Sequence, residues 1–141
     1  MRRLILDTQC LLSAVAAHAQ GRDTKLAHVW RTFRARETQL VFGEALLLET
    51  QRVLDYASVA RLGITSGMAF AAAADLLLLG EYHAPVVRHS WPSLSDPNDW
   101  HLLDLLYVAQ PDALVTRDAR VLAAGRALGM PVKMPEEVES E

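Results

Sequence analysis

The chain has 141 residues, of which 51% are hydrophobic, and it carries a formal net charge of −3. Its single cysteine excludes an internal disulfide framework and a cysteine-rich zinc site, and its longest apolar runs are shorter than the roughly 20 residues that a membrane span requires. We therefore expect one soluble globular domain and, because no signal peptide is recognised, a reducing cytoplasm.

Charge is unevenly distributed along this sequence. The last six residues contain Glu136, Glu137, Glu139 and Glu141, and without these four acids the rest of the chain carries +1. The net charge therefore does not exclude a nucleic-acid partner. We interpret residues 1–135 as one domain and residues 136–141 as an acidic C-terminal tail.

The first predicted element is a short strand, Leu4-Ile5-Leu6. Because this run has no polar face, it suits a strand that is buried on both sides in a parallel sheet covered by helices. Asp7 follows directly. That position lies at the carboxyl edge of the sheet, where open α/β sheets bind their ligands.

The middle of the chain alternates between helical and strand patterns. Helices are predicted over residues 11–19, 24–36, 44–56 and 65–79, and strands over residues 39–42 and 84–87. The second helix has a basic polar face, which is typical of a solvated surface, and the alternative is a surface that faces phosphates. Pro85 restricts the second strand to its first residues or to a sheet edge.

Glu49 is unusual within the helix predicted over residues 44–56. It lies beside the apolar stripe that Ala45, Leu46 and Val53 form at helical spacing. A carboxylate in that position costs free energy unless another group pairs with it.

The clearest helix start is Asp96-Pro97-Asn98-Asp99, where Asp96 can cap, Pro97 fits the first helical position and Asp99 takes the capping-box position. This helix runs to about Ala109, and a strand at 113–116, a helix at 118–129 and an edge strand at 131–134 follow. The alternation requires a parallel sheet with right-handed crossovers. We therefore predict a three-layer α/β/α sandwich around a central parallel sheet of four to five strands.

Four carboxylates are predicted to meet at the carboxyl edge of this sheet: Asp7, Glu49, Asp99 and Asp118. Because like charges repel, such a cluster requires a cation. Ligands that offer only oxygen atoms favour Mg²⁺ or Mn²⁺. An ion of this kind can activate water and neutralise charge that develops on a phosphate.

Structural roles are the alternative for several of these residues. Asp96, Asp99 and Asp118 could each cap a helix, and for Asp96 capping is favoured over catalysis. Asp7 and Glu49 are harder to explain by structure alone. The five histidines show no metal-ligand spacing, and the sequence has no glycine-rich phosphate loop.

Four segments together resemble the PIN domain family, and they are Leu4 to Thr8, Glu49 to Leu54, Asp96 to Asp99 and Leu114 to Asp118. The resemblance spans almost the whole chain and is closest to the PIN subgroup of toxins from toxin-antitoxin systems. It implies a small α/β/α sandwich and a Mg²⁺- or Mn²⁺-dependent ribonuclease that acts on single-stranded or loop RNA.

The resemblance also implies roles for individual residues. Asp7, Asp99 and Asp118 would hold the ion, and Glu49 would complete the metal shell or orient the attacking water. Supporting positions around them are Thr8, Thr116 and Asp96. Expected RNA contacts are Arg117 and, from the basic face of the helix predicted over residues 24–36, Arg31 and Arg34.

Three positions depart from the family's usual pattern. Gln9 replaces the usual Asn, and Trp100 follows Asp99 where a polar residue is common. The indole of Trp100 could narrow the site or stack on a base. Asp104 also differs from the family's usual small residue, and we interpret it as a solvated charge.

Our first hypothesis is a metal-dependent RNA endonuclease, the toxin of a toxin-antitoxin pair. Its candidate partners are RNA, an antitoxin protein and a second copy of the chain, with no membrane. The second hypothesis is a non-catalytic RNA-binding or regulatory PIN-like module in which Gln9 and Trp100 weaken the metal site. A third hypothesis is a small-molecule binder at the sheet edge, but the sequence has no phosphate-binding loop to support it.

Overall fold

The computed structural model describes residues 1–53, 61, 63–84 and 89–139. A single parallel sheet organises them, with the strand order β3-β2-β1-β4-β5. The strands are β1 (Arg2–Leu6), β2 (Thr38–Gly43), β3 (Glu81–His83), β4 (Ala113–Val115) and β5 (Val132–Lys133). The predicted first strand is indeed central: its apolar run is buried on both faces, and Ile5 has no exposed surface.

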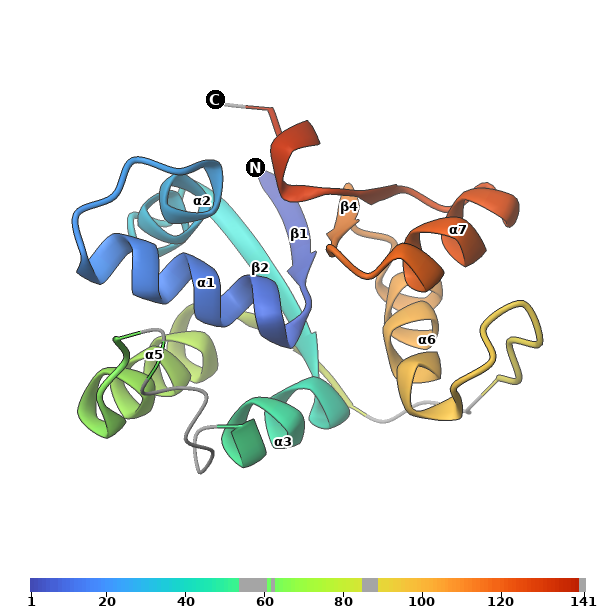
Figure 1. Cartoon of the computed structure of the whole chain (residues 1–141), viewed down its shortest axis with the longest axis horizontal. Coiled ribbons are helices and arrows are strands. Elements are labelled where there is room, and N and C mark those ends of the chain that lie inside the picture. The colour runs from blue at the N-terminus through green and yellow to red at the C-terminus, as the bar shows by residue number, and fades with distance from the viewer. Residues whose placement is uncertain (54–60, 62, 85–88, 140–141) are drawn as a thin grey trace.

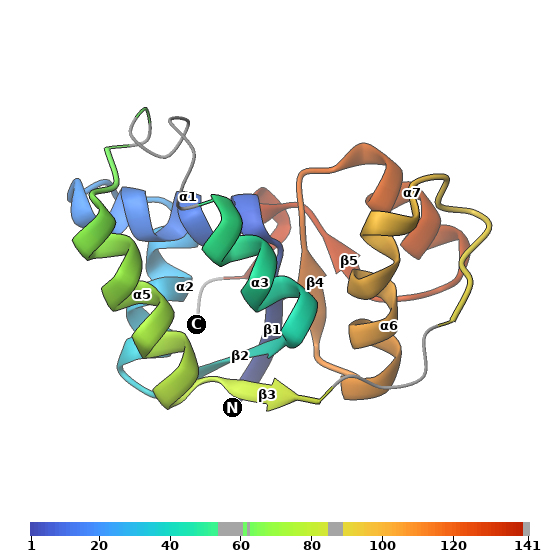
Figure 2. The same cartoon turned by 90° about the horizontal axis from the view of Figure 1, so that it is seen from below.

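Helices cover both faces of the sheet, which confirms the predicted α/β/α sandwich (Figure 1). The α-helices are α1 (Thr8–Ala19), α2 (Lys25–Arg34), α3 (Glu44–Val53), α5 (Ser66–Leu79), α6 (Trp100–Ala109) and α7 (Ala119–Ala127). Helices α1, α2, α3 and α5 form one layer, and α6 and α7 form the other (Figures 1 and 2). This division follows from right-handed crossovers, because the chain first builds the sheet outward from β1 and then returns to its other side.

Most helices begin at a side chain that accepts a hydrogen bond from the first turn. Asp7 caps α1, Thr24 caps α2, Thr65 caps α5 and Asp118 caps α7. Helix α1 therefore begins at Thr8, earlier than the apolar pattern predicts. Each of these caps is a Thr or Asp that precedes an apolar run, so the sequence alone can identify it.

The observed strand β3 lies just before the strand predicted over residues 84–87, of which only Ala84 is described, outside any strand. Strand β3 is formed by Glu81–His83, which pair with Val41 to Gly43 of β2. The strand begins this early because α5 ends at Gly80, directly beside the edge of the sheet. Residues 85–88 lie outside the described residues, as does the predicted continuation of α3 beyond Val53.

The acidic segment near the C-terminus packs on the domain. A 3₁₀ turn, η2 (Pro135–Glu137), places Glu136 beside Arg117 and Glu137 beside Arg126, with oxygen-to-nitrogen distances of 2.6 and 3.0 Å. Val138, which follows, is buried in the main core. Described residues 136–139 are therefore part of the folded unit.

Helix α7 approaches β5 at a distance that only glycine permits. A Cβ atom built on Gly125 would lie 2.4 Å from Cγ1 of Val132, well inside van der Waals contact. Glycine at this position therefore fixes how closely the helix lies on the strand.

No helix among the described residues is both long and apolar enough to cross a membrane.

Candidate active site

A cavity of about 240 Å³ opens at the carboxyl edge of the sheet, between the two helical layers. All four predicted acids line it. Its walls are Asp7, Thr8, Gln9, Glu49, Asp99, Leu102, Arg117, Asp118 and Val121. The sheet edge, α3, the start of α6 and the start of α7 thus bring together carboxylates that are far apart in the sequence.

Two of these acids, Asp7 and Asp118, are connected by the hydroxyl of Thr116. The Asp7 carboxylate accepts a hydrogen bond from the backbone N–H of Cys10 at 2.8 Å and another from Thr116 Oγ1. The same Thr116 oxygen accepts a hydrogen bond from the Asp118 backbone N–H at 3.1 Å. Thr116 is fully buried. Connected hydrogen bonds through Thr116 therefore hold the ends of β1 and β4 in register.

Asp118 is also bound to its own helix. Its Oδ1 accepts hydrogen bonds from the backbone N–H groups of Arg120, at 2.9 Å, and Val121, at 3.4 Å. Capping therefore explains part of the role of both Asp7 and Asp118. Because each carboxylate has two oxygens with several lone pairs, capping does not use up its capacity to accept further ligands.

Asp99 behaves differently from the other acids at helix starts. It precedes α6 but makes no capping hydrogen bond, whereas Asp96 accepts one from the backbone N–H of Asn98 at 3.0 Å. Burial raises the pKa of the Asp99 carboxyl, and the charges of Asp118, Asp96 and Glu49 raise it further. The capping explanation thus holds for Asp96 and is wrong for Asp99.

Glu49 has a partner that no sequence pattern indicates. Its Oε2 lies 3.3 Å from Nε2 of His101, in the first turn of α6, and its side chain is 48% exposed. The neighbouring imidazole of His101 is the main reason that the pKa of Glu49 is lowered. No spacing pattern could have found this pair, because the two residues come from different helical layers.

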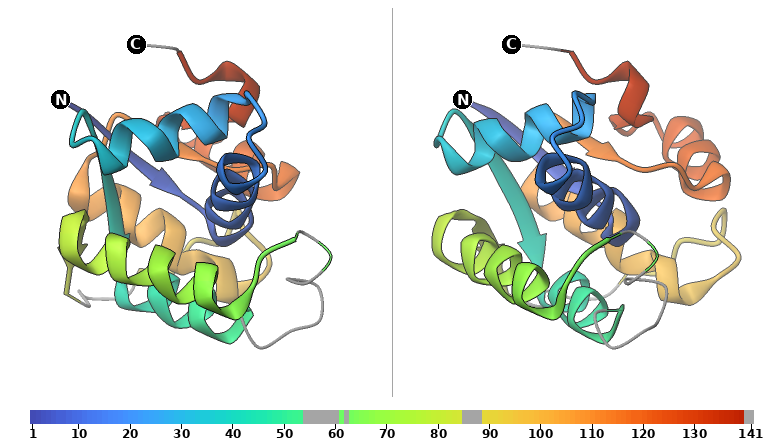
Figure 3. Two further views of the ribbon diagram at one scale, coloured as in Figure 1. Left: turned by 90° about the vertical axis from the view of Figure 1, so that its left-hand side faces the viewer. Right: turned by 60° about the vertical axis from the view of Figure 1, so that its left-hand side comes forward.

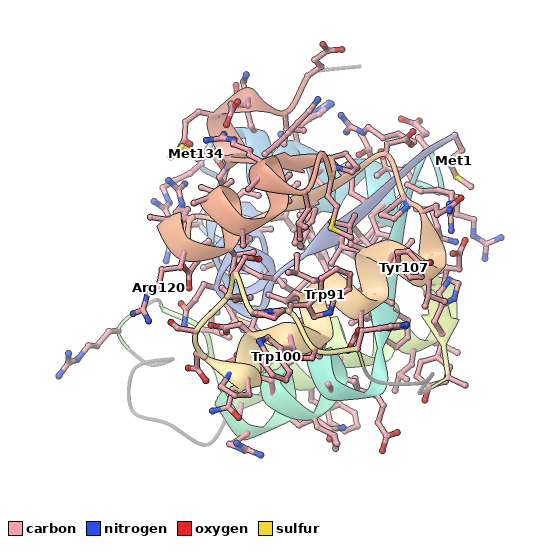
Figure 4. All side chains as sticks on the ribbon, turned by 90° about the vertical axis from the view of Figure 1, so that its right-hand side faces the viewer. Met1, Trp91, Trp100, Tyr107, Arg120 and Met134 are labelled. Carbon is pink, nitrogen blue, oxygen red and sulfur yellow. The ribbon has the colours of Figure 1, made fainter. Side chains whose placement is uncertain are left out.

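Two other interpretations of α6 residues need correction. Trp100 is not among the lining residues of the cavity, and its indole N–H donates to the Leu94 carbonyl at 2.8 Å. Asp104 is not a solvated charge, because it accepts hydrogen bonds from the Trp91 indole, at 2.9 Å, and the His89 backbone, at 3.1 Å. Figure 4 shows Trp91, Trp100 and Tyr107 along this side of α6.

The predicted RNA-contacting arginines divide into two groups. Arg117 lines the cavity, and its guanidinium pairs with Glu136. Arg31 and Arg34 are in α2 and do not line the cavity. Arg31 pairs with Asp23 at 3.4 Å, and Arg34 pairs with Asp75 of α5 at 3.3 Å.

The donor chemistry of the cavity fits a hard divalent cation. Four carboxylates line it, and one of them, Asp99, has a raised pKa that a bound cation would lower. Among the described residues, no three carboxylate, imidazole or thiol groups are close enough to share one ion as they stand. A common site would require side-chain rotation, for which Asp99 is free of a cap and Glu49 is half exposed.

Comparison with known proteins identifies the fold and the family. A domain of a functionally unknown protein from Methanocaldococcus jannaschii DSM 2661 is similar in structure, with a TM-score of 0.51 and 15% sequence identity over 100% of this chain and 96% of that chain. No curated protein matches the sequence. The sequence model of the PIN domain family matches residues 3–120, which include all four acids. PIN domains are generally nucleases and typically use divalent metals. The chain belongs to the PIN domain family.

Proposed function

We propose that this protein is a Mg²⁺- or Mn²⁺-dependent endoribonuclease and serves as the toxin of a toxin-antitoxin pair. The observation that carries the enzymatic part is the convergence of Asp7, Glu49, Asp99 and Asp118 on one cavity at the carboxyl edge of the sheet. Family membership supports a nuclease. The toxin role rests on the resemblance of the motifs to that subgroup.

Each residue has a definable task in this proposal. Asp7, Asp99 and Asp118 would hold the ion, which when bound supplies an activated water and neutralises charge on the phosphate. The hydroxyl of Thr116 fixes Asp7 relative to Asp118. Glu49, which contacts His101, would complete the metal shell or orient the water that attacks phosphorus as the bond to the leaving oxygen breaks.

The decisive experiment measures cleavage of a labelled single-stranded RNA with and without metal. Cleavage should require Mg²⁺ or Mn²⁺ and should be lost in excess EDTA. Asp99→Asn should reduce the rate by at least about 100-fold, because it removes a charged ligand without removing a helix cap.

The matched control is Asp23→Asn, prepared in the same way. Asp23 is 97% exposed and does not line the cavity, so this variant should cleave at the wild-type rate. Equal activity of the Asp99 variant, or undiminished cleavage in EDTA, would show that a contaminating nuclease or another mechanism is responsible.

RNA binding can be tested through the two groups of arginines. Arg117→Ala should weaken RNA binding about tenfold or less and flatten its salt dependence, because Arg117 lines the cavity. Arg31→Ala and Arg34→Ala serve as controls that also remove one positive charge each. If the controls weaken binding more than Arg117→Ala does, the RNA follows α2 instead.

A non-catalytic RNA-binding module is the second candidate. It is favoured by the engagement of Glu49 with His101 and by the absence, among described side chains, of three donors gathered on one point. Titration of the intact protein with Mn²⁺ separates the two functions. A saturable thermal shift with cleavage supports the nuclease, whereas RNA binding without either response supports the module.

A further inference from the structure

The acidic segment that follows β5 is bound by basic side chains from distant parts of the chain. Arg117, between β4 and α7, pairs with the carboxylate of Glu136 at 2.6 Å, and Arg126 of α7 pairs with that of Glu137 at 3.0 Å. Lys25, at the start of α2, donates to the backbone carbonyl of Glu136 at 2.7 Å. Figure 3 shows η2, which carries both glutamates, between α2 and α7. The segment therefore occupies a surface on which positive charges from several elements meet.

The backbone of this segment is anchored, whereas the carboxylate of Glu136 is not. Pro135 and Val138, on either side of the two glutamates, are buried. Glu137 also accepts a hydrogen bond from the backbone N–H of Met134 at 2.9 Å. The side chain of Glu136 is 60% exposed, and an ion pair at such exposure contributes little to folding. The Glu136 carboxylate can therefore turn away from its arginine while the backbone stays in place.

Arg117 has a special position in the cavity of the candidate active site. Of the described residues that line this cavity, Arg117 alone carries a positive charge, and four others are acids. A strand of RNA that enters the cavity would meet mainly like charge, so its phosphates depend on this guanidinium for attraction.

The pairing with Glu136 uses the group that a phosphate would need. Nη1 of Arg117 donates to Oε1 of Glu136, and a phosphate oxygen is an acceptor of the same charged kind. Because the backbone of the segment is anchored, the carboxylate is always close to the guanidinium, as a tethered ligand is to its site. An RNA phosphate must therefore displace the carboxylate before it can bind both sides of the guanidinium fork.

We propose that Glu136 competes with RNA for Arg117, so that the acidic segment lowers the affinity of the candidate active site for RNA. The inference rests on the proposed function, since it takes RNA as the anion that Arg117 binds. It adds an autoinhibitory contact to that function. RNA binds when its phosphates turn the Glu136 side chain out into solvent.

Binding of a labelled single-stranded RNA to the full chain, measured by fluorescence anisotropy in EDTA, tests the proposal without cleavage. Glu136→Gln should bind about three- to tenfold more tightly than the wild type, because Arg117 is released for the phosphate. The slope of log affinity against log salt should steepen by about 0.7, which corresponds to one more phosphate contact.

Glu137→Gln is the matched control. It removes the same charge from the adjacent residue, but its partner Arg126 does not line the cavity. Its affinity for RNA should stay within about twofold of the wild type.

A double-mutant cycle isolates the contact itself. In the Arg117→Ala background, Glu136→Gln should change the affinity by less than about twofold, because no guanidinium remains to be released. An undiminished gain in this background would show that Glu136 acts through net charge alone and would overturn the proposal.

Other outcomes would also overturn it. These are equal affinity of Glu136→Gln and the wild type, an equal gain in Glu137→Gln, and RNA binding by none of the proteins. A Glu136→Gln variant that melts several degrees lower without a gain in affinity would show that the pair is structural. Cleavage in Mg²⁺ is measured separately: tighter binding without cleavage contradicts the nuclease alone, and cleavage without tighter binding contradicts the competition alone.

Discussion

The two sides of the candidate active site are built in different ways. On the strand side, Asp7 and Asp118 are tied to backbone N–H groups and to each other through Thr116. On the helix side, Asp99 has no cap and Glu49 depends on one contact with His101 across the cavity. Backbone geometry thus fixes the first pair, whereas side-chain electrostatics governs the second.

Under the proposed function, this difference would separate preorganised metal ligands from adjustable ones. A ligand that also caps a helix cannot move far without loss of folding free energy. A ligand with a raised pKa and no cap can move toward a cation, since binding relieves an unfavourable charge. The following variants test whether the two sides respond as differently as their contacts suggest.

Removal of Asp7 should have the largest effect. Asp7→Ala removes the α1 cap and leaves the buried Thr116 hydroxyl without its acceptor, so the free energy of unfolding should fall by about 2–3 kcal/mol. The melting temperature should fall by about 5–10 °C. Asp7→Asn, which retains an oxygen for the cap, should lose less. Equal melting of Asp7→Ala and wild type would show that the strand side is not preorganised by these bonds.

Addition of Mn²⁺ should give the next largest response. An ion that binds only the native state would raise the melting temperature of the wild type by about 2–5 °C at saturation. Asp99→Asn should gain much less, because it lacks the proposed ligand that caps no helix. A full shift in this variant would place the ion on the strand side only. Thermal melts of both proteins with and without Mn²⁺ give the answer.

Asp99→Asn should stabilise the metal-free protein slightly. Because the folded-state pKa of Asp99 is raised, its charged form destabilises the native state, and this penalty develops as the pH rises from the ordinary carboxyl pKa through the raised value. At neutral pH the variant should melt about 1–3 °C higher than the wild type. The gap should close in acid. A variant that melts lower at neutral pH would reveal an undetected structural bond to Asp99.

Glu49→Gln should have the smallest effect, with the opposite pH dependence. The lowered pKa of Glu49 means that its charge stabilises the fold above the ordinary carboxyl pKa and that this stabilisation is lost as the pH falls through the lowered value. Because the side chain is half exposed and screened by solvent, the difference should be about 1 °C. Glu37→Gln, which changes an exposed carboxylate outside the cavity lining, is the control in the same melting series.

The parts of the fold that could be predicted from sequence are those that local patterns determine. The Leu4 to Leu6 run could only be a strand buried on both sides, and the threonine and aspartate caps mark where helices begin. The position of β3 depends instead on pairing with β2. A polar segment such as Glu81–His83 has no apolar pattern of its own, and it becomes a strand because α5 ends beside the sheet edge.

For the site, the sequence could identify the acids but not their surroundings. Asp7 and Asp118 follow predicted strands, so topology alone places them at one edge. The contacts of Glu49 with His101 and of Asp104 with Trp91 join segments whose relative placement only tertiary packing decides. Contacts of this kind join different segments of the chain, so no periodic pattern in the sequence predicts them.

The contact of Gly125 in α7 with Val132 in β5 lies outside the cavity lining, yet it bears on the position of one of the lining acids. Gly125 rests directly on Val132, and Asp118 sits at the start of the same rigid helix. The close approach at Gly125 therefore helps to determine the position of the whole helix, including Asp118 at its start. A methyl group at residue 125 would clash with Val132, so α7 would have to move away from β5. The carboxylate of Asp118 would move with the helix. The spacing of the acids is thus set in part by a residue that never touches them.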